Sequence, residues 1–130
     1  MKITRLRLRE LAGSFAHEGS YWEERLQRPI DVYPEHRAQA PGFWMPELTG
    51  EGRYRIRTVF LQVETDEVVW GIAGPIPHEI AYIINQQFAP LLHGEDPLAH
   101  ERLWDKMYRD AIHGRKGPTM LAISTIDCAL

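Results

Sequence analysis

Cysteine, one-sided charge and long apolar runs are all scarce or missing in this sequence of 130 residues. Cys128 is its one cysteine, which excludes an internal disulfide framework and a cysteine-rich zinc site. Fifteen basic against eighteen acidic residues give a net charge of −3, so no overall field attracts nucleic acid or anionic lipid. No apolar run approaches the roughly 20 residues of a membrane span, and the N-terminus lacks a signal-peptide pattern. We therefore predict a cytoplasmic protein that binds neither nucleic acid nor membrane.

Sequence motifs of catalysis and metal binding are missing as well. No two histidines have the His-x-x-x-His spacing, and no serine lies in a Gly-x-Ser-x-Gly elbow. The adjacent carboxylates are typical of solvated faces or turns rather than of an acid–base pair. The remaining composition, 44% hydrophobic and 25% charged residues, is that of one ordinary globular domain. Spacing and composition alone therefore support no complete catalytic site and no metal site in this chain.

Three stretches have the pattern of β-strands. Residues 2–10 alternate, with Thr4, Leu6 and Leu8 on one side and arginines on the other. Residues 55–65 and 68–73 are rich in β-branched and apolar types and are separated by a short acidic turn, which predicts a hairpin. Residues 74–77 contain two prolines and are expected to end the sheet, because proline cannot donate to a ladder. The pattern predicts a three-stranded antiparallel meander.

Between the first two predicted strands, residues 13–50 lack any periodicity. Four prolines and four glycines interrupt this stretch, which predicts a long loop. A disordered linker would be poor in aromatic residues, yet this stretch holds six. They are Phe15, Tyr21, Trp22, Tyr33, Phe43 and Trp44. We expect a loop that folds onto another surface, which need not belong to this chain.

The second half of the sequence predicts two amphipathic helices. Apolar residues recur with helical spacing over residues 80–91, and Pro90 is expected to bend or end that helix a turn early. Asp96 followed by Pro97 resembles an N-cap and first helical position, with a second helix whose apolar stripe runs over residues 103–111. Asp105 and Arg109 are spaced to pair across one turn, and Gly114 is a plausible stop.

Residues 118–130 are apolar nearly all round, which predicts a buried helix. Cys128 within it is expected to behave as a small, inert hydrophobic residue. This helix reaches the end of the sequence at Leu130 without a capping residue. The sequence therefore looks cut within a longer protein.

The last segment also carries a recognisable motif. Ala122, Ile123, Ser124, Ile126, Asp127, Ala129 and Leu130 fit the pattern Ala-Ile-Ser-x-Ile-Asp-x-Ala-Leu. Together with the three strands, the long loop and the helices, this motif resembles the N-terminal capping domain of the mandelate racemase and muconate lactonizing enzyme family in the enolase superfamily. The resemblance implies an α+β fold, a three-stranded antiparallel meander followed by a helical bundle segment, with the catalytic barrel absent.

The resemblance also implies a domain organisation. Residues 1–117 would form the capping domain, with residues 13–50 as its long specificity loop. Residues 118–130 would begin the linker helix into a missing (β/α)₈ barrel. The metal ligands and catalytic bases of the family stand on barrel strands, so no catalytic residue and no metal ligand is assigned to this chain. Magnesium is expected in the parent enzyme and not in this chain.

In such an enzyme the capping domain selects the substrate with two loops that close over the barrel. The second loop corresponds to residues 72–77. The candidate substrate-binding residues are His17, Tyr21, Trp22, Tyr33 and Trp44 in the first loop and Ile72 and Pro75 in the second. For each aromatic residue, packing within the lid is an alternative to substrate contact.

The length of the first loop and its Arg28-Pro29-Ile30 sequence are most similar to acid-sugar dehydratases of the rhamnonate dehydratase kind. The expected parent is a lyase that abstracts the proton next to the carboxylate of a sugar acid or hydroxy acid; racemisation and cycloisomerisation stay open. The fragment alone would be inactive. Its expected partners are the barrel, the substrate and further copies of itself, as a homo-oligomer or through self-association of exposed apolar surface. The alternative is a free-standing small binding protein that uses the aromatic loop.

Overall fold

Two long neighbouring strands, β1 (Ile3–Ala16) and β3 (Arg53–Thr65), organise the fold. The computed structural model describes residues 1–19, 21, 28–37 and 46–130. These residues form two units, and both strands run through both units. Unit 1 consists of Met1–Leu11 and Thr58–Leu130, and unit 2 of Ala12–Arg57. The main cluster of buried hydrophobic side chains belongs to unit 1.

The sheet has four strands. Strand β3 lies between β1 and β2 (Glu47–Gly50), and β4 (Trp70–Ile76) also pairs with β3. Strand β2 pairs with the first residues of β3, and β4 pairs with its later residues. Both β2 and β4 are antiparallel to β3. The predicted α+β class, strands first and helices after, is confirmed. The prediction of three strands missed β2, because four residues within a proline- and glycine-rich stretch are too few to show a period of two.

Strand β1 is longer than predicted, and its first residues do not follow the predicted alternation of buried and exposed side chains. It continues to Ala16, so the first residues of the predicted 13–50 loop are strand. Ile3 is 1% exposed, whereas Thr4, predicted to face inward, is exposed and donates its hydroxyl to the carbonyl of Glu64. Leu6 and Leu8 do pack against the core, as predicted.

Strand β4 corrects the prediction that residues 74–77 end the sheet. It continues through Gly74 and Pro75 to Ile76, which pairs with Val59. Between the Val59–Ile76 and Leu61–Ala73 pairs, two residues of β4 lie opposite one residue of β3. This is a β-bulge, and it leaves Pro75 at a position where no ladder N–H is required.

The first helical run packs on the sheet and does not end early. It consists of α2 (His78–Ile83), a π-helical turn η2 (Ile84–Phe88) and α3 (Ala89–Leu92). Pro90 lacks an N–H, and its ring would clash with a carbonyl one turn earlier in a regular α-helix. The wider π turn just before it accommodates the ring, so the helix continues. Ile80, Ile84 and Phe88 are fully buried along the predicted stripe.

Helix α4 (His100–Asp110) begins one turn later than predicted. The Asp96 side chain does not cap it. Instead, its carboxylate accepts a hydrogen bond from the Leu98 amide at 3.0 Å, and its backbone carbonyl accepts one from Ala99 at 3.1 Å. Asp96 thus makes a separate turn, and Ala99 is the N-cap.

The rest of the α4 prediction holds in part. Leu103, Met107 and Ala111 are buried, and Arg109 donates to Asp105 at 2.7 Å. Helix α4 ends at Asp110, so Gly114 lies beyond its end rather than forming the stop.

The last helix, α5 (Pro118–Ala129), is buried on one face only. Ala122, Ile123, Ile126 and Ala129 are buried, whereas Leu121 is 57% exposed. Cys128 is exposed too, so the expectation of a thiol hidden in a wholly buried helix is wrong.

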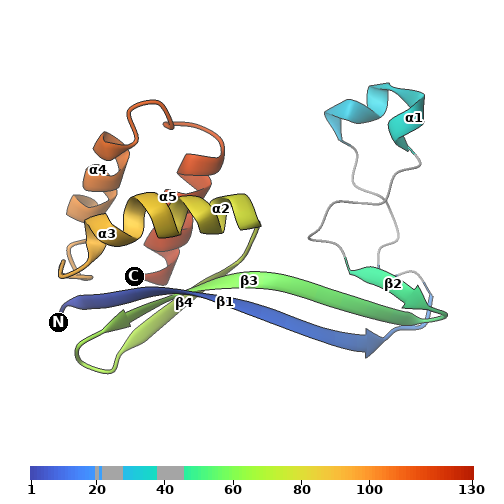
Figure 1. Ribbon diagram of the computed structural model, residues 1–130, viewed down its shortest axis with the longest axis horizontal. Helices are drawn as coiled ribbons and strands as arrows, with labels where there is room; N and C mark the ends of the chain where they lie inside the picture. The colour runs from blue at the N-terminus through green and yellow to red at the C-terminus, as the bar shows by residue number, and fades with distance from the viewer. Residues whose placement is uncertain (20, 22–27, 38–45) are drawn as a thin grey trace. The chain divides into compact units, whose positions relative to one another are not determined.

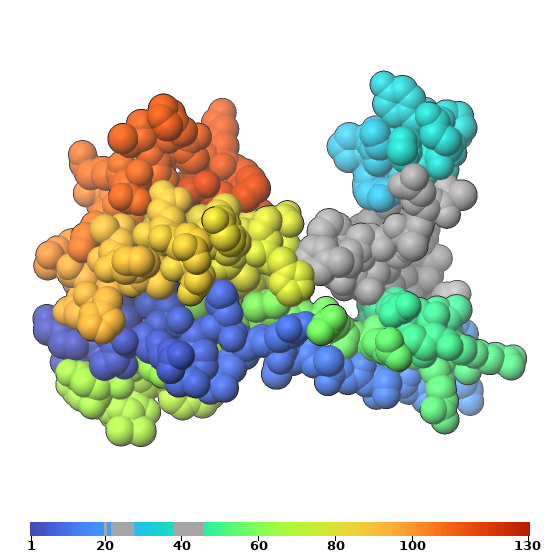
Figure 2. All heavy atoms as spheres, in the orientation of Figure 1, coloured from blue at the N-terminus to red at the C-terminus, as the bar shows by residue number. Residues whose placement is uncertain are grey.

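Helix α5 packs against β4, α2 and α4. The helices of unit 1 lie on one face of its strands (Figure 1), and Figure 2 shows them packed directly on those strands. Within the described ranges, every helix is too short or too polar to cross a lipid bilayer.

Candidate functional site

Unit 2 brings two of the predicted substrate-binding residues together. His17 and Tyr21 follow the end of β1, and their ring centroids are 5.7 Å apart at an edge-to-face angle. The ring centroid of Phe15, near the end of β1, is 5.1 Å from that of Tyr21. His17 is exposed and Tyr21 is 42% exposed, so both offer ring surface to a ligand. Edge-to-face ring pairs add roughly 0.5–1.5 kcal/mol beyond the area they bury.

Tyr54 lies at the centre of this cluster, and sequence analysis missed it. Its ring stacks on Phe15 at 5.6 Å and lies 5.7 Å from Tyr21 and 6.3 Å from His17. Its hydroxyl donates to the Gly19 carbonyl at 3.1 Å and accepts from the Tyr21 amide at 3.2 Å. Aromatic residues are common in strands, so the sequence gives no reason to single out Tyr54. Only its position next to β1 in the folded protein identifies it as part of the candidate site.

An open cavity of about 790 Å³ lies beside the cluster, within unit 2. His17, Glu18 and Glu51 give it polar walls, and the His17 amide donates to the Gly52 carbonyl at 2.9 Å. Carboxylates accept hydrogen bonds from hydroxyl groups, and an imidazole can accept or donate one. The cavity and the neighbouring rings together suit a polyhydroxylated ligand better than a purely apolar one.

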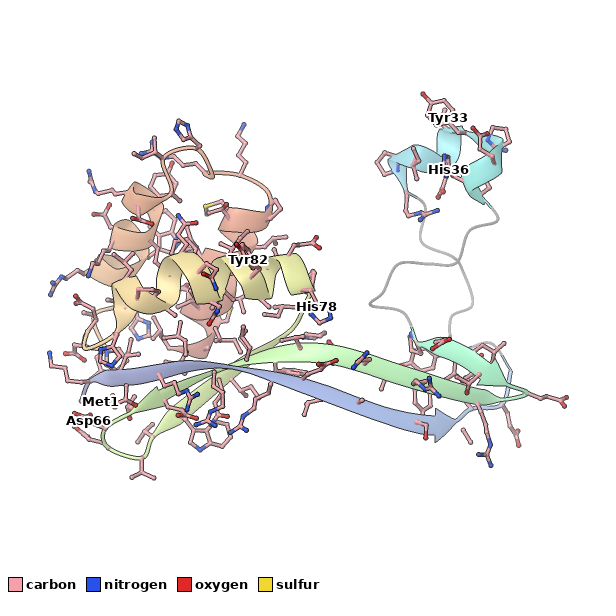
Figure 3. All side chains as sticks on the ribbon, viewed as in Figure 1. Met1, Tyr33, His36, Asp66, His78 and Tyr82 are labelled. Atoms are coloured by element: carbon pink, nitrogen blue, oxygen red, sulfur yellow. The ribbon has the colours of Figure 1, made fainter. Side chains whose placement is uncertain are left out.

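Tyr33 is held on a separate short segment made of η1 (Pro29–Val32) and α1 (Pro34–Arg37). Its ring meets His36 edge-to-face at 6.4 Å. Figure 3 labels both side chains on this segment. Asp31, 6% exposed, accepts hydrogen bonds from the amide and guanidinium of Arg28, and its carbonyl accepts one from Arg37. A buried carboxylate is tolerated only when its charge is compensated in this way. These bonds fix the turn that presents Tyr33, which is 55% exposed.

Ile72 and Pro75 belong to a second candidate site, which lies in unit 1. They line a shallow groove of about 350 Å³ between β4 and the exposed side of α5. Leu121, Ser124 and Cys128 form its other wall. Ile72 is 49% exposed, so this groove offers apolar surface, together with the hydroxyl groups of Ser124 and Thr125.

The remaining predicted site residues, Trp22 and Trp44, lie outside the described residues. Within the described part of the chain, no group of three or more histidine, cysteine, aspartate or glutamate side chains is placed to hold a metal ion. The clearest electrostatic perturbations belong to ion pairs of unit 1. A hydrogen bond from Arg7 lowers the pKa of Glu64, and one from Lys106 lowers the pKa of Glu95. These pairs tie structural elements together and do not line either candidate site.

Comparison with known proteins gives a consistent answer. The model of the mandelate racemase/muconate lactonizing enzyme N-terminal domain matches residues 45–130. L-rhamnonate dehydratase from Saccharopolyspora erythraea is 28% identical over 137 aligned positions, covering 100% of this chain and 33% of that protein. The chain therefore spans a third of the length of this curated relative.

Two solved structures are also similar. The 3,6-anhydro-D-galactonate cycloisomerase from Zobellia galactanivorans is 31% identical with a TM-score of 0.50, over 55% of this chain and 21% of that one. An enolase-superfamily member from Polaromonas sp. JS666 covers 98% of this chain and 28% of its own, at 23% identity and a TM-score of 0.56. The second likeness extends the fold assignment to nearly the whole chain.

Proposed function

The chain belongs to the mandelate racemase/muconate lactonizing enzyme family, whose N-terminal domain it forms, and we propose that it is the substrate-capping lid of an acid-sugar dehydratase. The observation that carries the proposal is the alignment with L-rhamnonate dehydratase, which extends through residues 1–44, outside the family model. That stretch includes residues 13–44 of the long aromatic loop, which we propose as the part of the lid that selects the substrate. The reaction proposed for the parent is removal of the proton next to a carboxylate, followed by loss of water.

The two candidate sites support a lid function in different ways. The His17–Tyr21 cluster and the adjoining cavity offer rings and hydrogen-bonding groups for a sugar acid. The groove at Ile72 and Pro75 offers mainly apolar wall. A lid that excludes water strengthens electrostatic stabilisation of the enolate formed in the barrel, and its side chains determine which acid fits.

The chemistry itself is assigned to a barrel domain. In this family the N-terminal domain pairs with a catalytic barrel. We propose that magnesium would be bound by barrel residues and would supply charge stabilisation there. We propose residues 1–117 as the capping domain and residues 118–130 as the start of the linker helix. Self-association and a cytoplasmic location stay predictions.

The test begins with the coding sequence downstream of Leu130. The complete product and the 130-residue chain would both be assayed, with and without magnesium, on a panel of sugar acids that includes L-rhamnonate. We expect a barrel to follow, magnesium-dependent dehydration by the complete product, and no turnover by the 130-residue chain.

Two outcomes would contradict the proposal. A folded, magnesium-loaded complete enzyme that racemises or cycloisomerises its substrate without losing water would overturn the dehydratase assignment while keeping the lid. An intact gene that stops after codon 130 would instead favour the alternative, a free-standing binding protein that uses the aromatic loop.

A further inference from the structure

We propose that Tyr54 is a positioning residue that locks the segment carrying His17 and Tyr21 onto strand β3. The link between this positioning and substrate selection rests on the proposed lid function. The positioning itself rests on the contacts of Tyr54 described above. Tyr54 does not need to touch a ligand. It acts through the two residues that offer exposed rings beside the cavity.

The hydroxyl of Tyr54 is the first half of the lock. One hydroxyl has one hydrogen to donate and lone pairs to accept, and here both functions are used on the same short segment. The hydrogen goes to the Gly19 carbonyl, and the oxygen receives the Tyr21 amide. Tyr54 is 9% exposed and both hydrogen bonds are partly buried, so water competes for them less than it would at the open surface. Losing them would leave two backbone groups to find new partners.

The ring of Tyr54 is the second half. It contacts the rings of Phe15, His17 and Tyr21, so the hydroxyl and the ring hold the same segment by different interactions. The two contributions can be separated. Tyr54→Phe keeps the ring and removes the two hydrogen bonds, whereas removal of the ring would disturb the whole cluster.

Gly52 holds the same segment at a second point. Its carbonyl accepts the His17 amide, and its φ of +63° is a conformation that glycine adopts easily. A Cβ at this position would lie 3.2 Å from the His17 carbonyl oxygen. Gly52→Ala therefore perturbs the anchor of His17 without touching Tyr54.

The test is amide hydrogen exchange of the 130-residue chain, followed residue by residue by NMR. Tyr54→Phe should speed exchange at the Tyr21 amide about tenfold, the size expected for loss of a hydrogen bond at the strong end of the usual range. Exchange at Leu61 and Val63, in the core of unit 1, should not change. Gly52→Ala should speed exchange at the His17 amide.

The matched control is Tyr108→Phe. Tyr108 stacks on Trp104 at 4.9 Å in unit 1, so this variant also removes a tyrosine hydroxyl from a ring pair. It should leave exchange at Tyr21 unchanged. Unchanged exchange at Tyr21 in Tyr54→Phe, or equal acceleration in both variants, would overturn the lock.

A kinetic measurement links the lock to selection. In the complete enzyme, Tyr54→Phe should raise KM for the substrate several-fold and change kcat less, because lid residues are displaced while the barrel is untouched. The exchange experiment uses no substrate. Its failure would refute the lock and leave the proposed function standing, whereas a failed activity assay would leave the exchange result intact.

Discussion

Gly71 shows how one residue can determine where a helix lies. It is on strand β4, and a Cβ built on it would fall on the carbonyl oxygen of Ala129, at the end of α5. The obstacle is backbone, so a larger residue cannot be accommodated by a rotamer change. Gly71→Ala should therefore push the end of α5 away from the sheet. We expect a loss of about 1–3 kcal/mol in the free energy of unfolding, the usual cost of overpacking, measured by urea denaturation.

Gly13→Ala is the control for this substitution. Gly13 also lies in a strand, β1, but a Cβ there would meet no atom within 4 Å. The control should change the free energy of unfolding by less than about 0.5 kcal/mol, as expected for a surface substitution. Equal stability of Gly71→Ala and Gly13→Ala would show that α5 does not rest on β4 as described.

The candidate site was only partly predictable at the scale of residues. Tyr21 stood out because aromatic residues are unusual in a proline- and glycine-rich loop. His17 was named with it as a candidate of the first lid loop, and the structure brings the two together. Tyr54 gave no such signal, because its neighbours in sequence are those of a strand. Its role depends on the pairing of β1 with β3, which no local pattern encodes.

At the scale of elements, periodicity predicted which residues are buried in the middle of a helix better than it predicted where the helix begins and ends. The buried stripes of α2–α3 and α4 follow the 3.6-residue repeat. The ends depend on partners elsewhere: Asp96 uses its carboxylate in a turn rather than as a cap, and Pro75 is tolerated in β4 because a bulge lies there. The exposed face of α5 was missed because Ser124 and Asp127 are its only clearly polar residues, and the apolar types on either side of them outweighed this weak signal.

Helix α4 is tied to the turn before it by an ion pair that makes a pH-dependent prediction. Lys106 donates to the Glu95 carboxylate at 2.8 Å and to the Leu91 carbonyl at 2.9 Å. The Lys106 hydrogen bond lowers the pKa of Glu95. The folded state therefore favours the ionised carboxylate, and this contribution is present above the ordinary glutamate pKa and lost as pH falls through the lowered value.

The measurement is an NMR titration of the Glu95 carboxyl. We expect a pKa below the usual glutamate value in the wild type and a rise towards that value in Lys106→Met. Lys116→Met, which removes a lysine from an exposed turn, should leave the Glu95 titration where it was. An unchanged Glu95 pKa in Lys106→Met would rule out the ion pair as its cause.

At the scale of the whole molecule, the main hydrophobic core and the aromatic candidate site lie in different units. Unit 1 contains the hydrophobic cluster built on Leu61, Ile84 and Ile123, all of them fully buried. Unit 2 contains the aromatic cluster and the cavity of the candidate site. If the specificity residues of a lid lie outside the main core, they can be substituted with little loss of stability. Binding residues are generally placed on loops for the same reason.

This separation predicts that unit 1 folds without unit 2. Backbone hydrogen bonds from Asp66 to Lys2 and from His17 to Gly52 show that β1 and β3 run antiparallel. Residues 12–57 can therefore be replaced by an Asn-Gly turn that joins Leu11 directly to Thr58. Such two-residue turns match the twist of antiparallel strands. The shortened protein should unfold cooperatively in urea, with core amides such as that of Leu61 still protected from exchange. A shortened chain without protected core amides would show that unit 1 needs residues 12–57 to fold, and selection could then not vary independently of stability.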